Sequence, residues 1–447
     1  MTGVDVVVAG AGCAGLAAAA ALADAGVRVA VIEARRVLGG RTFATRDQVT
    51  GDWIDNGQHV LLGCYHDTLA FTRRVGADRL LAVQSALRVP MIDLAGVASE
   101  LRIPTLPAPL HLLAGVLAWS ALSWPERLSV ISLGPALATR AASLDGQTVR
   151  QWLAAHGQAP RLCDLLWEPL AVAALNQSID TAAATTFVEV VRRMLGPGPD
   201  DAALVLPTRS LTHTFVEPAV AFLERHGGQV HAGAAARVVF DGGRAVGVDV
   251  KGERIDARAV IAAVPWYGLA GLCGDQAPGP LHEVITAASA MRSSPIVTAN
   301  LWFDRPVLTQ PFVGLPGRSF QWAFDRGQVT AGESTSISMV CSGADAVVQQ
   351  SNEEIVATAL GELRRAIPEV AAASLRRGTA VRERRATFSL APGEPARPST
   401  HTAVPGLWLA GDWIDTGLPA TIESAVVSGH RAAAAVLAHL GGLAASR

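Results

Sequence analysis

The sequence predicts an α/β fold in which a discontinuous Rossmann-like domain carries an inserted α+β domain. Residues 4–33 read as a buried strand, a glycine-rich turn, an alanine-rich helix and a second strand. Strand patterns return at 229–251, as a hairpin, and at 258–264. A short strand at 406–410 then precedes a long helix at 421–440. Helical and mixed segments separate these nucleotide-binding elements, so we expect the intervening chain to form the second domain.

The turn after the first strand has the spacing of a dinucleotide-binding site. Gly10 permits the tight turn, Gly12 lets the backbone approach a pyrophosphate, and Gly15 lets the helix pack closely on the strand. The start of the helix offers free N–H groups and a positive dipole end to the phosphates. Glu33 lies 18 residues after Gly15, where an acid accepts hydrogen bonds from an adenosine ribose. We expect the phosphates to lie against Gly10, Gly12, Cys13, Ala14 and Gly15.

The segment after the second strand indicates which dinucleotide is bound. Glu33-Ala34-Arg35 is followed by Gly39-Gly40-Arg41-Thr42, and together they resemble the second fingerprint of the FAD-dependent amine oxidase and carotenoid desaturase superfamily. The resemblance implies an amine-oxidase-like fold and FAD, which we expect to be bound without covalent attachment. In that superfamily the glycine pair lets the chain pass close to the cofactor, and the arginine reaches the pyrophosphate. The expected FAD-binding residues therefore include Ala34, Arg35, Gly40, Arg41 and Thr42.

The run from Leu407 to Asp412 is similar to the last FAD motif of the same superfamily. The similarity implies that Gly411 and Asp412 meet the ribityl chain. It also implies that Thr421 and Ile422 begin a helix whose positive end faces the flavin C2 carbonyl, where reduced flavin gathers negative charge. In the predicted hairpin, Val238 matches the position whose backbone meets adenine.

Residues 55–59 fall where the superfamily brings its chain against the flavin ring, so we expect Gly57 and Gln58 to contact the cofactor. His59 follows the glycine turn directly. It is open to three interpretations: a general acid, a flavin contact, or a hydrogen-bonded core histidine. Asp55 and Tyr65 are weaker candidates for the same acid.

Composition excludes several classes of function. A net charge of −2 gives no reason to expect nucleic acid, and five scattered cysteines support neither a disulfide framework nor a metal site. Met1 is followed closely by the first strand, so we expect no signal peptide and a cytoplasmic protein. The 447 residues have room for two or three domains. We place the FAD domain at 1–85, 205–285 and 390–447, and the substrate domain at 86–204 and 286–389.

One stretch suggests contact with a membrane. Residues 103–125 contain no charged side chain, and Leu110 to Trp124 is predicted to form a single helix. A bilayer span needs about 20 residues, so this helix is too short to cross. It is either a buried helix or a monotopic insertion at the membrane surface. In the second case the protein would lie peripherally on the inner face of the cytoplasmic membrane.

Amine oxidation is disfavoured as the activity. Such an enzyme is expected to place a lysine near flavin N5 and aromatic rings around the substrate's cationic amine. The chain has one lysine, Lys251, in the predicted hairpin, and only two tyrosines. Leu418 and Pro419 stand just before the last helix, where an amine oxidase often has a tyrosine.

Residues 55–65 and 411–426 resemble the hydroxysqualene dehydroxylases, which are squalene-associated FAD enzymes of bacterial hopanoid pathways. The resemblance implies reductive removal of an allylic hydroxyl from hydroxysqualene, by hydride transfer from reduced flavin to an allylic cation, to give squalene. It also implies a hydrophobic isoprenoid substrate, companion squalene-pathway enzymes and an external electron donor, such as a reduced nicotinamide. A phytoene- or carotene-type desaturase is the alternative, and a non-catalytic flavin-bound membrane protein is a third interpretation.

Overall fold

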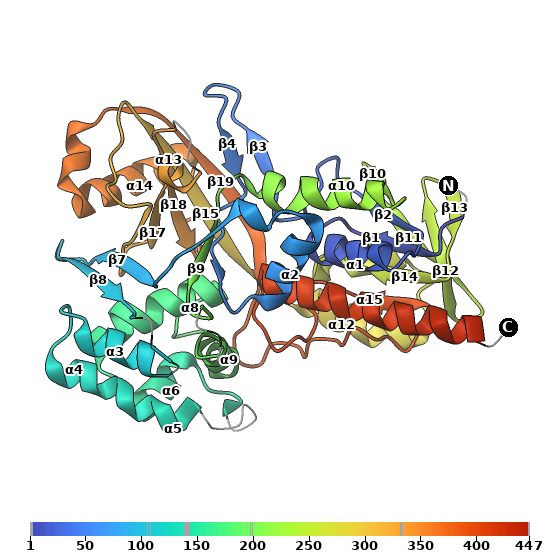
Figure 1. The fold of residues 1–447 in the computed structure, drawn as a ribbon, viewed down its shortest axis with the longest axis horizontal. Coiled ribbons are helices and arrows are strands. Elements are labelled where there is room, and N and C mark those ends of the chain that lie inside the picture. The colour runs from blue at the N-terminus through green and yellow to red at the C-terminus, as the bar shows by residue number, and fades with distance from the viewer. Residues whose placement is uncertain are drawn as a thin grey trace.

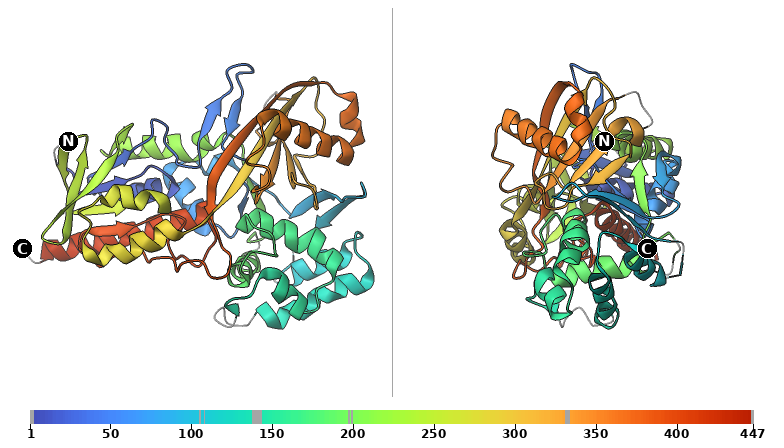
Figure 2. Two further views of the ribbon diagram at one scale, coloured as in Figure 1. Left: turned by 180° about the vertical axis from the view of Figure 1, so that it is seen from behind. Right: turned by 90° about the vertical axis from the view of Figure 1, so that its left-hand side faces the viewer.

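The computed structural model describes residues 3–104, 106–107, 109–137, 144–196, 198, 200–330 and 334–445. The molecule is elongated, and both ends of the chain lie at the same end of it (Figures 1 and 2). A five-stranded sheet forms that end. A seven-stranded sheet and a group of helices form the other end. This arrangement confirms the predicted α/β class.

The five-stranded sheet is parallel and has the order β10-β2-β1-β14-β20. Its inner strands β1, β2 and β14 carry nearly continuous small or branched apolar residues and are buried, as expected for a sheet covered on both faces. Helices α1, α10 and α15 cover one face, and the three-stranded sheet β11-β12-β13 lies over the other. The bounds are β1 Val6–Ala9, α1 Cys13–Asp24, β2 Val29–Glu33, α10 Glu217–Arg225, β10 Gln229–Ala232, β11 Ala236–Asp241, β12 Arg244–Val250, β13 Glu253–Asp256, β14 Ala259–Ala262, β20 Leu407–Leu409 and α15 Ile422–Ala445.

The predicted hairpin over 229–251 is only partly correct. β11 and β12 pair as an antiparallel hairpin, but β10 is the edge strand of the parallel sheet and pairs with β2. Strand alternation alone does not distinguish these partners. Gly233, with a φ of +72°, separates β10 from the hairpin.

The seven-stranded sheet has the order β19-β15-β18-β17-β16-β7-β8, and α14 packs on one of its faces. Its pairs are antiparallel except where β16 meets β7. The opposite face of the long strands β15 and β19 lies toward the FAD-binding end. The bounds are β7 Arg88–Ile92, β8 Ala98–Arg102, β15 Ser293–Phe303, β16 Phe312–Gly314, β17 Trp322–Asp325, α13 Arg326–Val329, β18 Ser336–Ser342, α14 Asn352–Ala366 and β19 Leu375–Phe388.

Of the remaining helices, α3 to α9 lie below the second sheet, whereas α2 contacts α15, and α11 contacts β11 and α12; the remaining strands are short (Figure 1). The helices are α2 His66–Val75, α3 Leu110–Ala118, α4 Trp124–Leu128, α5 Leu133–Leu137, α6 Val149–Ala155, α7 Pro160–Leu162, α8 Glu168–Leu175, α9 Ala184–Met194, α11 Leu269–Cys273 and α12 His282–Ala290. The strands are β3 Ala44–Arg46, β4 Trp53–Asp55, β5 Leu61–Leu62, β6 Leu81–Val83 and β9 Leu204–Pro207.

The apolar stretch at 110–124 is not one helix. α3 ends at Ala118, Trp119 has an extended backbone with a ψ of 110°, and α4 begins after Ser123. Ser123 and Glu126 form a capping box, which starts a new helix at Trp124, the residue at which the predicted helix ends. The apolar composition therefore predicted that the stretch is helical, but it did not predict that a capping box divides it into two helices.

Candidate functional site

A cavity of about 840 Å³ runs along the carboxyl ends of β1 and β2 toward the start of α15. Its size lies in the range of cavities that enclose whole organic ligands. The three FAD motifs, which are far apart in the chain, all line it. The predicted residues found in its wall are Gly10, Gly12, Cys13, Ala14, Glu33, Ala34, Arg35, Gly40, Arg41, Thr42, Gly411, Asp412, Thr421 and Ile422.

The glycines of this cavity fit an approaching dinucleotide. Gly10 has a φ of +112°, and a Cβ on Gly15 would lie 2.0 Å from the Gly10 carbonyl oxygen. These two glycines are therefore required by the protein itself. Gly12 differs, because a Cβ there would meet only the Gly40 Cα, at 3.9 Å. Since the protein leaves room at Gly12, we interpret that room as space for the pyrophosphate.

Glu33 is held rigidly at the end of β2. Its carboxylate accepts hydrogen bonds from the backbone N–H of Ala11 at 2.9 Å and of Arg35 at 2.8 Å. The side chain is buried yet lines the cavity, so its remaining lone pairs suit the predicted ribose contact. At this end of the cavity the wall is formed by Ala236 and Arg237. Val238 packs into the core beside them.

Arg41 joins three separate parts of the site. Its guanidinium donates to Asp412 at 2.6 Å and to the carbonyl oxygen of Ala386, on β19, at 2.8 Å. Burial opposes its charge, but the carboxylate of Asp412 outweighs this effect and raises the pKa of Arg41. The second fingerprint, the last motif and β19 are thereby fixed relative to one another. The contact of Arg41 with a pyrophosphate stays a prediction.

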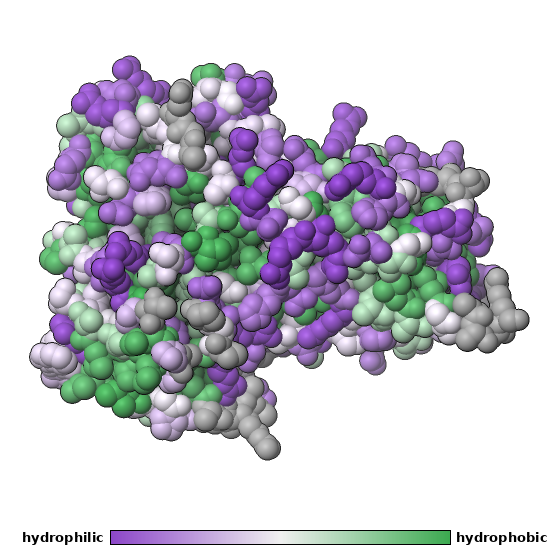
Figure 3. Space-filling view, in the orientation of Figure 1, coloured by the Kyte–Doolittle hydropathy of each residue, from purple (hydrophilic) through white to green (hydrophobic). Residues whose placement is uncertain are grey.

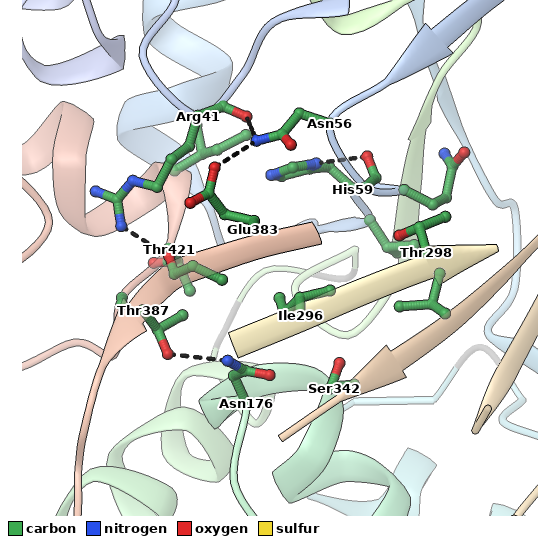
Figure 4. A pocket seen from close by; sticks show the side chains of 18 of the residues that line it. Arg41, Asn56, His59, Asn176, Ile296, Thr298, Ser342, Glu383, Thr387 and Thr421 are labelled. Atoms are coloured by element: carbon green, nitrogen blue, oxygen red, sulfur yellow. Dashed lines mark hydrogen bonds between the residues drawn. The ribbon is translucent and has the colours of Figure 1, made fainter. Parts of the chain in front are cut away.

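A second, smaller cavity of about 170 Å³ opens beside the first (Figure 4). It lies between the turn at 56–60, the strands β15, β18 and β19, and the end of α8. Gly57 and Gln58, predicted to contact the cofactor, line this cavity. The two cavities share seven lining residues, which are Arg41, His59, Glu383, Ala386, Ala420, Thr421 and Ile422.

The three predicted acid candidates lie in different surroundings. His59 lines both cavities, and its Nδ1 lies 3.1 Å from the carbonyl oxygen of Gly57. Burial lowers the pKa of His59. Tyr65 lines the smaller cavity, and burial raises its pKa. Whether His59 or Tyr65 acts on a substrate stays a prediction.

Asp55 lines neither cavity. Its carboxylate forms a buried ion pair with Arg326 at 2.8 Å and accepts a hydrogen bond from the N–H of Leu211 at 2.8 Å. Arg326 also donates to Gln58 at 2.6 Å. Contrary to our expectation, Asp55 therefore does not lie in a cavity wall with the other two candidates; it fixes the turn at 56–60, which we call the flavin-facing turn after its predicted role.

Sequence reasoning missed two polar residues that line the smaller cavity. Glu383 follows Arg382 on β19 and accepts a hydrogen bond from Asn56 at 3.1 Å. Asn176 has a φ of 55°, and its buried amide donates to Thr387 at 3.0 Å and accepts from Gly343 at 2.7 Å. Glu383 is the one acidic residue of β19, a strand with five arginines, and this was the available signal for it. Asn176 is brought to the site by tertiary packing alone.

The fold and the cavity are those of an FAD-binding oxidoreductase. From residue 13 to residue 437 the chain matches the family described as flavin containing amine oxidoreductase. It is 34% identical to hydroxysqualene dehydroxylase of Rhodopseudomonas palustris, over 96% of this chain and 97% of that one, and 31% identical to hydroxysqualene dehydroxylase of Sinorhizobium fredii, over 96% and 97%. The chain therefore belongs to the flavin-containing amine oxidoreductase family, in which it groups with the hydroxysqualene dehydroxylases, and its cofactor is FAD.

More distant similarities agree with this family. The chain is 27% identical to 15-cis-phytoene desaturase of Glycine max, over 97% of this chain and 79% of that protein. Among solved structures, an oxidoreductase from Methanosarcina mazei has a TM-score of 0.75 at 18% identity, covering 96% of this chain and 99% of that one. Cyclohexylamine oxidase from Brevibacterium oxydans has a TM-score of 0.71 at 19% identity, covering 98% and 99%. At these identities the structures establish the fold alone.

Proposed function

We propose that the protein removes the hydroxyl group of hydroxysqualene reductively and releases squalene. The observation that carries this proposal is the small cavity that opens onto the larger one at the predicted flavin end, in a chain 34% identical to a hydroxysqualene dehydroxylase. Apolar side chains form much of its wall: Val60, Leu61, Ala173, Ala174, Ile296, Val340 and Val381. Such a wall suits an isoprenoid hydrocarbon chain.

The position of the one lysine argues against amine oxidation. Lys251 lines the larger cavity, as do Arg237 and Asp249, and does not line the smaller one. Leu418 occupies the position just before the last helix where an amine oxidase often has a tyrosine, and its side chain is buried, with 2% exposure. Of the described residues that line the smaller cavity, the only aromatic rings are those of His59 and Tyr65. A protonated amine would therefore meet few π faces.

Reduced FAD, when bound, supplies the hydride for this reaction. The chain contributes three things to the chemistry. The boundary between the cavities orients the carbon that loses its hydroxyl, the apolar wall excludes water that would trap an allylic cation, and an acidic side chain supplies a proton to the leaving oxygen. The N-terminal end of α15, where Thr421 accepts a hydrogen bond from the N–H of Ser424 at 3.1 Å, provides a positive dipole end beside the cavity.

The test is to follow hydrogen from the cofactor to the product. The enzyme, reduced with deuteride in heavy water, is mixed with hydroxysqualene, and the extracted squalene is analysed by mass spectrometry. We expect one non-exchangeable deuterium per squalene. Squalene without the label would refute hydride delivery from the flavin. In a parallel sample the oxidised enzyme is mixed with phytoene, and a desaturated product there, with no squalene in the first sample, would favour the desaturase alternative.

We also propose that the protein lies on the inner surface of the cytoplasmic membrane. Several large apolar side chains of α4 and the segments next to it are exposed, namely Leu110 at 55%, Trp124 at 64%, Leu128 at 51% and Ile131 at 52%. Figure 3 shows an apolar patch over these helices. No described helix is long and apolar enough to cross a bilayer, so a surface insertion is the contact that these residues support. A substrate almost insoluble in water would enter directly from the lipid.

A further inference from the structure

The boundary between the two cavities is where a proton donor must lie if the proposed function is correct. Removal of a hydroxyl group requires a proton at the leaving oxygen, and the carbon must lie close to the cofactor at the same time. Of the described residues that line both cavities, three carry ionisable side chains: Arg41, His59 and Glu383. One of these three is therefore best placed to supply the proton.

Arg41 and His59 are poorly suited to this task. The guanidinium of Arg41 does not release a proton in proteins, and it is already paired with Asp412. The Gly57 carbonyl oxygen can only accept a hydrogen bond, so the Nδ1 of His59 carries the proton in that contact. In the neutral ring, which burial favours by lowering the pKa of His59, Nε2 then has no proton to give. His59 can instead accept a hydrogen bond from a hydroxyl group in the cavity.

The pairing of β19 with β15 is irregular next to Glu383, whose side chain lines both cavities. β19 pairs with β15 through Thr387 and Ser294, and next through Glu383 and Ile296. Three residues of β19, 384–386, thus lie opposite the single residue Pro295 of β15. Such bulges redirect side chains and are frequent next to active sites. The hydrogen bond from Arg41 to the Ala386 carbonyl oxygen holds this bulge in place.

Asn56 orients the carboxyl group of Glu383. The Asn56 amide donates to the Arg41 carbonyl oxygen at 3.1 Å and to Glu383 Oε2 at 3.1 Å (Figure 4). Asn56 thereby fixes Oε2, and Oε1 is the oxygen left with the weaker contact. Oε1 accepts a hydrogen bond from the backbone N–H of Arg385, also on β19, and this bond is longer, at 3.3 Å.

We propose that Glu383 is the catalytic acid of the dehydroxylation, an assignment that rests on the proposed function. Glu383 transfers the proton on Oε1 to the hydroxyl oxygen of the substrate. The C–O bond then breaks with both electrons going to oxygen, water leaves, and the carbon becomes an allylic cation. Hydride transfer to that carbon forms the new C–H bond, and the Glu383 carboxylate regains its proton from solvent. His59 Nε2 accepts a hydrogen bond from the substrate hydroxyl and so orients it.

The test compares Glu383→Gln with Glu383→Asp and His59→Gln in the FAD-loaded enzyme. Glutamine keeps the size of the side chain and its bond from Asn56 but has no proton to give. We expect Glu383→Gln to lower the single-turnover rate with hydroxysqualene by roughly a hundredfold or more. FAD content and the affinity for squalene, measured by flavin fluorescence, should stay at wild-type values. Glu383→Asp keeps a carboxyl group, and His59→Gln removes only the acceptor for the substrate hydroxyl, so each should lose less of the rate than Glu383→Gln.

Each outcome decides the assignment. A Glu383→Gln rate within tenfold of wild type overturns it, and so does a Glu383→Asp rate as low as that of Glu383→Gln. If Glu383→Gln loses FAD, Glu383→Asp decides: a variant that keeps FAD but has no more activity than His59→Gln would contradict an acid at this position. Failure of the wild type to convert hydroxysqualene would instead refute the proposed function.

Discussion

The buried ion pair between Asp55 and Arg326 gives the sharpest prediction for stability. Their side chains are 5% and 8% exposed, so water solvates neither charge well, and each charge is stabilised by the other. Replacing Arg326 with methionine keeps much of the apolar stem but leaves the Asp55 carboxylate, among the residues that the structure describes, with the N–H of Leu211 as its one hydrogen-bond donor. Breaking a buried pair from one side typically costs about 3–5 kcal/mol. We therefore expect Arg326→Met to lower the free energy of unfolding by that amount.

Urea unfolding followed by tryptophan fluorescence measures this change. With a slope of roughly 3 kcal/mol per molar urea, the loss corresponds to a midpoint lower by about 1 to 1.7 M. The matched control is Arg254→Met, which breaks the exposed pair with Asp256, whose side chains are 53% and 77% exposed. Exposed pairs contribute little, so the control midpoint should stay near that of the wild type.

A double variant separates the unpaired charge from a general loss of packing. Adding Asp55→Asn to Arg326→Met removes the buried charge and should recover part of the lost stability, because the interaction energy of contacting residues is not additive. An Arg326→Met midpoint equal to that of Arg254→Met would refute the reasoning. A double variant that is less stable than Arg326→Met alone would show that the unpaired charge is not the cause.

Three further predictions concern the cofactor, the membrane and acid stability. Gly12→Val should yield protein without bound FAD, because a side chain would fill the room left for the pyrophosphate; a full flavin absorption spectrum would contradict this assignment. Replacing Trp124 and Leu128 together with aspartate should abolish flotation with liposomes and spare FAD content, and a wild type that does not float would refute the membrane proposal. Burial would raise the pKa of Asp47, but backbone N–H donors and Arg377 outweigh this and lower it to about 2. Its contribution to stability is thus complete above about pH 4 and is lost as the pH falls to 2, so Asp47→Asn should be less stable than wild type at pH 7 and nearly equal to it at pH 2.

The sequence predicted residues that the structure brings together in the wall of the larger cavity, because these residues lie in short local motifs. Gly10, Gly12 and Glu33 are tied to one strand–turn–helix–strand unit, whose geometry follows from hydrogen bonding and the need for small residues at close contacts. The smaller cavity could not be predicted in the same way. Glu383 and Asn176 come from elements more than 200 residues apart, and their meeting depends on how the second sheet packs on the flavin-facing turn. The break in the helix at Trp119 was missed because apolar composition carries no signal for a capping box.

A catalytic acid at Glu383 requires that the two ends of the molecule keep fixed positions relative to each other. The residues expected around FAD come mainly from the five-stranded sheet and its loops, whereas the proposed acid comes from the seven-stranded sheet. Proton and hydride must reach the same substrate, and a displacement of about 1 Å can slow such a reaction by roughly a hundredfold. Arg41 binds Ala386 in the bulge of β19, Asn56 binds Glu383, and Arg326 binds Asp55 and Gln58 in the flavin-facing turn. These contacts tie the seven-stranded sheet to the second fingerprint and the flavin-facing turn, so together they hold the proposed acid in place at the boundary of the two cavities.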